Sequence, residues 1–103
     1  MATFQLIDVH GAKLELAKDN VILVDIRDEN SYDTEHVEGS FHLTNESIGR
    51  FIKEVPKNNT VLVLCYHGNS SKGVAQYLCD QGYADVYSVD GGFESWRFEY
   101  FSK

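Results

Sequence analysis

Two short apolar runs constrain the fold of this chain more than any other feature. Residues Val21–Ile26 are apolar at five of six positions, and Thr60–Leu64 repeat the pattern. A continuous apolar run of this length is typical of a strand covered on both faces, as in parallel sheets. Shorter strands are predicted over Gln5–Ile7, Ser40–Leu43 and Val86–Val89. We therefore expect a sheet whose two faces are both buried.

Helical patterns separate these strands. Helices are predicted over His10–Lys18, Glu29–Glu35, the segment between Asn45 and Pro56, Ser71–Gln81 and the residues after Gly91-Gly92. Thr44-Asn45 should cap the third helix, and Leu14 and Ala17 should lie on the apolar side of the first. The aromatic residues assigned to the core are Tyr77, Tyr83, Phe93 and Trp96. This alternation predicts an α/β fold with a mostly parallel sheet.

A cysteine directly follows the second apolar run. Residues Cys65–Ser71 read Cys-Tyr-His-Gly-Asn-Ser-Ser and lie where a buried strand turns into a helix. The first N–H groups of a helix lack partners and attract anions, which lowers the pKa of a cysteine placed beside them. Gly68 suits a tight turn, Asn69 tolerates unusual dihedral angles, and Ser70 and Ser71 are candidate helix caps. Taken alone, Cys65 is more typical of a small buried hydrophobe, but the whole segment favours a thiolate nucleophile.

Composition and charge exclude several classes of function. The chain has 103 residues, enough for one compact domain, and a formal net charge of −7 argues against nucleic acid or acidic lipid as a partner. Its apolar runs are too short to cross a membrane, and the N-terminus lacks a secretory pattern. Two cysteines, Cys65 and Cys79, are too few for a disulfide framework and lack metal-site spacing. We expect a cytoplasmic protein that attracts anions only locally, through backbone N–H groups and Arg27 or Lys72.

Four segments resemble the rhodanese family in order and spacing, over about residues 4–100. They are Val24–Arg27, His36–Ser40, Cys65–Ser70 and Gly91–Trp96. Two further segments, His42–Asn45 and Cys65–Gly73, look like the family's single-domain thiosulfate sulfurtransferases. Glu38 and Ser40 depart from the usual residues of the family, but they lie away from the cysteine loop.

The resemblance implies one rhodanese domain over residues 4–100, with a three-layer α/β/α fold and a five-stranded, mostly parallel sheet. It implies sulfur transfer from thiosulfate through a persulfide on Cys65, to cyanide, a dithiol or thioredoxin, with no metal or organic cofactor. Backbone N–H groups would bind the substrate from Tyr66, His67, Gly68, Asn69, Ser70 and Ser71. Asp25 would brace the site, and Arg27 would pair with a nearby carboxylate.

Several residues keep two interpretations. His67 is either an acid, base or cationic wall or, with no carboxylate partner visible, a donor only through its backbone. Lys72 either draws anions inward or is a solvated surface charge. His36 and His42 are expected to be packed or hydrogen-bonded rather than ligands, and Cys79 to pack rather than to resolve a persulfide.

Three other functions remain open. A persulfide carrier for a partner protein would share the chemistry of Cys65. A tyrosine-phosphatase-type enzyme or arsenate reductase would use a similar loop, but it needs an arginine six residues after the cysteine, where Ser71 stands. The related rhodanese-like phosphatases have a loop one residue longer. A non-catalytic binding module often lacks the cysteine.

Overall fold

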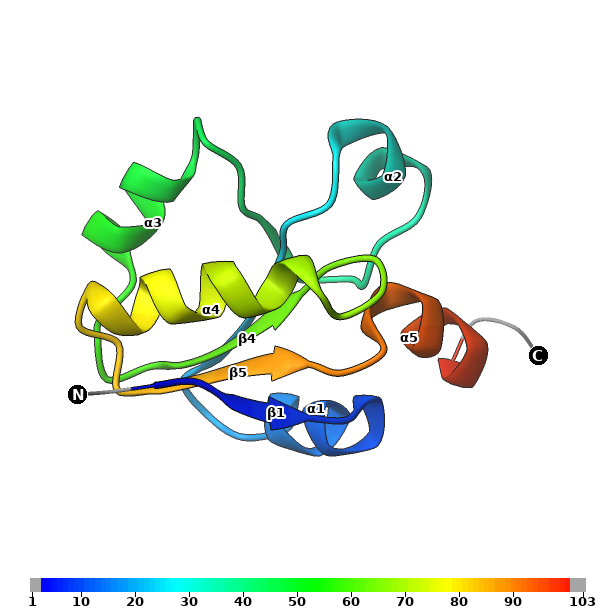
Figure 1. The fold of residues 1–103 in the computed structure, drawn as a ribbon, viewed down its shortest axis with the longest axis horizontal. Coiled ribbons are helices and arrows are strands. Elements are labelled where there is room, and N and C mark those ends of the chain that lie inside the picture. The colour runs from blue at the N-terminus through cyan, green and yellow to red at the C-terminus, as the bar shows by residue number, and fades with distance from the viewer. Residues whose placement is uncertain (1–2, 101–103) are drawn as a thin grey trace.

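The computed structural model describes residues 3–100. Within them, one sheet has the strand order β1-β5-β4-β2-β3, and all its pairings are parallel (Figure 1). The strands are β1 (Gln5–Ile7), β2 (Val21–Asp25), β3 (Phe41–His42), β4 (Thr60–Leu64) and β5 (Asp85–Val89). The predicted sheet is confirmed, and this part of the chain is parallel throughout rather than mostly so.

Helices cover both faces of the sheet. They are α1 (Val9–Leu16), α2 (Glu29–Thr34), α3 (Ile48–Glu54), α4 (Ser70–Asp80) and α5 (Gly92–Tyr100). Figure 1 shows α3 and α4 on one side of the sheet and α1 on the other, so the predicted three-layer α/β/α architecture is confirmed. Within the described residues, no helix has the length and apolar character to cross a membrane.

The position of β4 between two layers of helices explains why its last four residues, 61–64, are all apolar. Val61 and Val63 belong to a core cluster with Ala75 and Leu78 of α4, whereas Leu62, on the opposite face, belongs to a cluster that includes Trp96 of α5. Successive side chains of a strand point to opposite faces. Because helices cover both faces, a polar side chain at any of the positions 61–64 would be buried.

Two expectations about helix faces are wrong. Leu14 is 58% exposed, and Ala17 is exposed as well. Helix α1 begins at Val9, one residue earlier than predicted, with Asp8 as its N-cap. Its buried positions are Val9 and Ala12. Leu14 is two residues after Ala12, about 200° around the helix axis, so the side that buries Ala12 leaves Leu14 in solvent.

Among the aromatic residues, the predictions for Tyr83, Phe93 and Trp96 are confirmed, because all three are buried. Tyr77 is 44% exposed, and its assignment to the core is wrong. Helix α4 buries Ala75 and Leu78 instead. One helix stripe packs against the sheet, and Tyr77 lies outside it.

The turn before α3 is closed by two reciprocal hydrogen bonds. The Thr44 N–H donates to Ser47 Oγ at 2.8 Å, and the Ser47 N–H donates to Thr44 Oγ1 at 3.2 Å. The expectation that Thr44-Asn45 caps the third helix is wrong, because α3 starts at Ile48 and its N-cap is Ser47; Thr44 instead closes the turn that precedes the helix. This turn anchors the chain where it leaves β3, at the carboxyl edge of the sheet.

Two glycines in open space should respond oppositely to alanine. A Cβ at Gly49 or at Gly39 would meet nothing within 4 Å, but only Gly39 has a positive φ, of 86°. Gly49→Ala should raise the free energy of unfolding by about 0.5–1 kcal/mol, because alanine restricts the unfolded chain. Gly39→Ala should lower it by roughly 1 kcal/mol, because an L-residue is strained at that φ. Urea denaturation would measure both, and equal effects of the two substitutions would show that the φ of Gly39 does not decide the outcome.

Candidate active site

The carboxyl ends of two neighbouring strands bring the predicted site residues together. Asp25 is the last residue of β2 and pairs in register with Leu64, the last residue of β4. Cys65 follows directly and is only 4% exposed. Parallel strands end at one edge of the sheet, which is where ligands bind in open α/β sheets. The fold therefore places Asp25 behind the cysteine and leaves the loop after Cys65 at the rim.

Hydrogen bonds surround the Cys65 sulfur. The Gly68 N–H donates to Sγ at 3.0 Å, and Ser71 Oγ lies 3.3 Å from Sγ. Burial alone raises the pKa of the Cys65 thiol. The Ser71 hydroxyl and the backbone N–H groups of Ser71, Gly68 and His67 outweigh burial, so the pKa lies below its ordinary value. The arrangement favours a thiolate on a sulfur that is largely shielded from water.

Helix α5 holds the backbone of this loop in its orientation. The Phe93 N–H donates to the Cys65 carbonyl at 2.7 Å, and the Glu94 N–H donates to the Tyr66 carbonyl at 3.0 Å. In a trans peptide the N–H points opposite to the C=O. Because α5 holds these two carbonyls, the N–H groups of Tyr66 and His67 point away from α5. The N-terminus of α5 thus turns donors of the loop inward.

Glycine is required at this junction. A Cβ at Gly92, where φ is +61°, would lie 2.5 Å from both the Cys65 and the Tyr66 carbonyl oxygens. A Cβ at Gly68, where φ is +97°, would lie 2.8 Å from the Gly91 nitrogen. The loop and α5 therefore meet backbone to backbone. This close contact explains why the segment Gly91–Trp96 has glycine at position 92.

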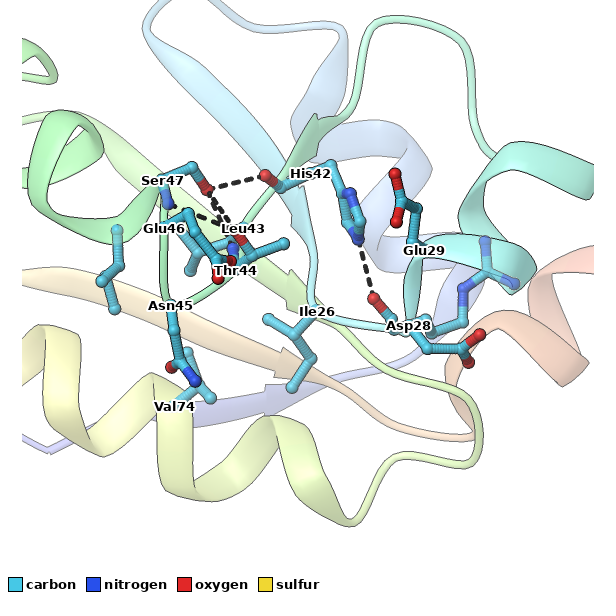
Figure 2. Close-up of a pocket in the computed structure, with 12 residues that line it drawn as sticks. Ile26, Asp28, Glu29, His42, Leu43, Thr44, Asn45, Glu46, Ser47 and Val74 are labelled. Carbon is cyan, nitrogen blue, oxygen red and sulfur yellow. Dashed lines mark hydrogen bonds between the residues drawn. The ribbon is translucent and has the colours of Figure 1, made fainter.

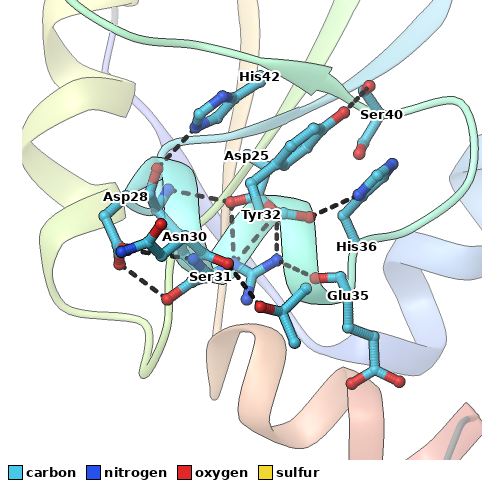
Figure 3. Close-up of polar contacts among 11 residues, drawn as sticks. Asp25, Asp28, Asn30, Ser31, Tyr32, Glu35, His36, Ser40 and His42 are labelled. Atoms are coloured by element: carbon cyan, nitrogen blue, oxygen red, sulfur yellow. Dashed lines mark hydrogen bonds and ion pairs between the residues drawn. The ribbon is translucent and has the colours of Figure 1, made fainter.

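An ion pair beneath the loop involves Asp25 and Arg27 (Figure 3). Arg27 Nη2 lies 2.9 Å from Asp25 Oδ2 and also donates to the Glu35 carbonyl at 2.7 Å. Its guanidinium carbon lies 3.9 Å from the centre of the Phe93 ring. Both side chains are buried, so removing one partner would leave an unpaired buried charge. The pair forms as expected, and it supports Phe93 and α5.

The expectation that His67 has no carboxylate partner is wrong. His67 Nδ1 lies 2.8 Å from Glu94 Oε1, and both side chains are 60% exposed. The His67 ring also stacks on Tyr66. Glu94 is 27 residues away in the sequence, and only the packing of the Gly91–Trp96 segment against the loop brings it close. An exposed pair of this kind contributes little to stability, but it fixes a histidine at the rim of the site.

The loop residues after Gly68 differ from expectation. Asn69 has φ −96° and ψ −52°, an ordinary helical conformation, and serves as the N-cap without a side-chain hydrogen bond. Helix α4 starts at Ser70, so Ser70 and Ser71 are helical residues rather than caps. Gly68 alone takes the positive φ that the turn needs, and this allows the helix to begin early. Lys72 lies exposed in its first turn.

The Ser71 side chain contacts the Cys65 sulfur and a second serine rather than capping the helix. It is fully buried, and its hydroxyl lies 2.7 Å from that of Ser88 on β5 as well as near the Cys65 sulfur. Sequence reasoning missed Ser88, because a lone serine in a strand carries no motif. Its only signal is a hydroxyl at a core position of β5.

The two histidines assigned a structural role have one. The Tyr32 ring lies between those of His36 and His42, with centroid distances of 3.9 and 4.2 Å. His42 Nε2 lies 2.7 Å from the Arg27 carbonyl, and His36 Nδ1 lies 2.6 Å from the Tyr32 carbonyl (Figure 3). These contacts hold the β2–α2 segment beside the site.

A pocket of about 830 Å³ adjoins the start of α4, and sequence reasoning did not foresee it (Figure 2). Val74 and Ile26 line it on one side, and the segment from His42 to Ile48 lines the other. Its carboxylates are Asp28, Glu29 and Glu46. The Arg27 that also lines it is already paired with Asp25. The lining therefore disfavours an anion, and anion binding is left to the cysteine loop.

Three comparisons with known proteins agree with this geometry. A family model described as "Rhodanese-like domain" matches residues 8–99. The chain is 50% identical to a protein named Thiosulfate sulfurtransferase GlpE from Tolumonas auensis, over 97% of this chain and 94% of that protein. A rhodanese-related protein from Thermoplasma volcanium has a TM-score of 0.79 at 20% identity and covers 95% of both chains. A Rhodopseudomonas palustris protein described as a possible tyrosine phosphatase has a TM-score of 0.77 at 23% identity, covering 93% of this chain and 81% of that one. The last two likenesses show the fold alone.

The two cysteines should differ in their reaction with iodoacetamide. Both are almost equally buried, but burial and the nearby Asp80 raise the pKa of Cys79, whereas the pKa of Cys65 is lowered. The thiolate fraction grows as the pH rises through the pKa. Alkylation of Cys65 should therefore have its midpoint at a lower pH than that of a free cysteine. Peptide mapping by mass spectrometry should find Cys79 slower, with a midpoint at higher pH. Faster alkylation of Cys79 would contradict the assignment.

Proposed function

This chain belongs to the rhodanese family, and we propose that it is a thiosulfate sulfurtransferase whose Cys65 carries the transferred sulfur. The identity of 50% over nearly the whole chain to a protein named for this activity supports the proposal. The single observation that carries it is the pair of contacts on Cys65 Sγ: the Gly68 N–H donates to the sulfur, and the Ser71 hydroxyl lies 3.3 Å away, where it can donate once the thiol has lost its proton. These contacts stabilise negative charge on Sγ, both in the thiolate that attacks and in the thiolate that the second step regenerates.

The first step forms the persulfide. The Cys65 thiolate attacks the outer sulfur of thiosulfate, and a new S–S bond forms. The S–S bond within thiosulfate breaks, and sulfite leaves with the electron pair. Inward N–H groups of the loop from Tyr66 to Ser71 would bind the substrate and then the terminal sulfur. Fixed donors in a site that excludes water stabilise such charge more than mobile surface lysines do, so we assign Lys72 at most a minor part.

The second step regenerates the thiolate. Cyanide attacks the terminal sulfur, the persulfide bond breaks, and thiocyanate leaves while Cys65 keeps the electron pair. A dithiol, or a dithiol protein such as thioredoxin, would take the sulfur in the same way and then release it as hydrosulfide on closing its own disulfide. This is covalent catalysis in two steps. Neither step requires a metal or an organic cofactor.

The arrangement of the other site residues supports this chemistry. Asp25 binds Arg27, Arg27 packs on Phe93, and the Phe93 N–H holds the Cys65 carbonyl. We assign the ion pair to support of the loop rather than to contact with substrate, because Asp25 and Arg27 are both buried.

A second candidate function is that of a persulfide carrier for a partner protein. The rim of the loop favours it, because Tyr66 is 43% exposed and the His67 side chain 60% exposed. A protein acceptor would thus meet an aromatic edge beside the sulfur. The chemistry on Cys65 is the same in both cases, and a comparison of cyanide, dithiothreitol and reduced thioredoxin as acceptors would distinguish them by rate.

The phosphatase and the binding module have less support. Phosphatase loops of the tyrosine-phosphatase type use an arginine to bind the oxyanion through two hydrogen bonds. Its place is taken here by Ser71, a buried hydroxyl directed at Cys65 and Ser88. A binding module would have no need for hydrogen bonds that lower the pKa of Cys65.

We further propose that residues 4–100 form one rhodanese domain and that the enzyme works in the cytoplasm. Both cysteines are free in the structure, and a reducing compartment would keep them so. The reaction needs Cys65 as a thiolate, which an oxidising compartment would consume.

Thiosulfate should load one sulfur atom onto Cys65. Intact-mass spectrometry should show a gain of about 32 Da that a thiol reductant reverses. Cys65→Ala should abolish the gain, and the matched control Cys79→Ala should retain it, because the Cys79 sulfur lies in the core without the loop's donors. A gain carried by Cys79 alone would overturn the assignment of the nucleophile.

Phosphate-ester hydrolysis should be negligible. The loop offers no guanidinium at the position of Ser71, where a phosphatase of this type needs one to bind the oxyanion through two hydrogen bonds. Turnover of para-nitrophenyl phosphate should therefore be the same for the wild type and for Cys65→Ser. Hydrolysis that is lost in Cys65→Ser would show that the loop acts on phosphate esters, and it would contradict the assignment of thiosulfate as the substrate.

A further inference from the structure

A serine occupies a core position in strand β5. Ser88 is fully buried, and its neighbours Val86 and Val89 are buried and apolar. A buried hydroxyl is unfavourable unless it is hydrogen-bonded. The Ser88 hydroxyl finds its partner in Ser71, whose Oγ lies 2.7 Å away and is equally inaccessible to water.

Ser71 connects Ser88 to the reacting sulfur. Ser71 Oγ lies 3.3 Å from Cys65 Sγ and 2.7 Å from Ser88 Oγ. The three side chains come from three separate segments, namely the loop after β4, the first turn of α4 and strand β5. Together they form a buried chain of two hydroxyls that ends on the sulfur.

This chain can serve both protonation states of Cys65 without moving a heavy atom, because a hydroxyl both donates and accepts. When Cys65 is a thiol, its S–H donates to Ser71, and the Ser71 O–H donates to Ser88. When Cys65 has lost its proton to solvent, both hydroxyls rotate. The Ser88 O–H then donates to Ser71, and the Ser71 O–H donates to the charged sulfur.

We propose that Ser88 is a positioning residue for the sulfur-transfer reaction: its hydroxyl commits the Ser71 hydroxyl to Cys65 Sγ, so that two hydroxyls in series stabilise negative charge on that sulfur. Without Ser88, the Ser71 oxygen has no donor when its own hydrogen turns to sulfur. The Ser71 hydroxyl is then free to donate instead to a backbone carbonyl of the preceding loop, as serine side chains at the start of a helix can do. Hydrogen bonds in a chain also strengthen one another.

The inference rests on the proposed role of Cys65 as the nucleophile, but its test needs neither thiosulfate nor turnover. The measurement is the pH midpoint of iodoacetamide alkylation at Cys65, followed by peptide mass spectrometry. Ser71→Ala should raise the midpoint by about one pH unit, because it removes a hydrogen bond to a charged group. Ser88→Ala should raise it by roughly half a unit, about a threefold loss of thiolate at neutral pH.

A double substitution separates a relay from a merely structural role. If Ser88 acts through Ser71, adding Ser88→Ala to Ser71→Ala should shift the midpoint no further. The control is Ser40→Ala. Within the described residues, Ser40 Oγ is a buried hydroxyl without a hydrogen-bond partner, and its removal should leave the midpoint unchanged.

Two results would overturn the proposal. One is an unchanged midpoint in Ser88→Ala while Ser71→Ala shifts it. The other is a shift from Ser88→Ala that is equally large in the Ser71→Ala background. Circular dichroism would verify folding, and if Ser88→Ala does not fold, Ser88→Cys replaces it, because its thiol is of similar size but only a weak donor. If the wild type forms no persulfide with thiosulfate but the serine variants still shift the alkylation midpoint as expected, the proposed function is contradicted and the role of Ser88 is not.

Discussion

Two backbone hydrogen bonds between the cysteine loop and helix α5 are the interaction on which the site depends. They hold the Cys65 and Tyr66 carbonyls on the N–H groups of Phe93 and Glu94. Turned the other way, these carbonyls would present negative ends to a negative sulfur. The helix N-terminus thus acts on the site indirectly, by binding the acceptors of the loop so that its donors face inward. The close contact leaves no room for a side chain at Gly92.

The two cysteines show how local this control is. Cys65 and Cys79 are 4% and 5% exposed, so burial opposes ionisation at both. Among residues 3–100, hydrogen-bonding groups lie against the sulfur of Cys65 but not against that of Cys79, and they reverse the direction of the pKa shift of Cys65. The acidic chain offers no long-range attraction for an anion, with a net charge of −7. The attraction for an anion therefore has to come from the N–H dipoles of the loop, which act at short range.

Where sequence reasoning succeeded, the determining forces were local or periodic. The apolar runs in β2 and β4 predicted a sheet covered on both faces, because every side chain of such a strand must be buried. Where it failed, the sequence did not decide which side of a helix packs or at which residue a helix starts. Helix α1 packs its Val9 and Ala12 side, which leaves Leu14 in solvent, and α4 starts at Ser70, which makes Ser70 and Ser71 helical residues instead of caps.

The sequence by itself determined the α/β fold, the position of Cys65 at the end of a buried strand and the glycine that turns the loop, since each depends on residues adjacent in the chain. Only the tertiary structure decided which groups meet the sulfur and its rim. Ser88 reaches the Cys65–Ser71 pair because β5 lies beside β4 in register, and Glu94 reaches His67 because α5 docks its N-terminus on the loop. These contacts join residues 17 and 27 positions apart. No local pattern encodes such distances, because they are set by the packing of whole elements.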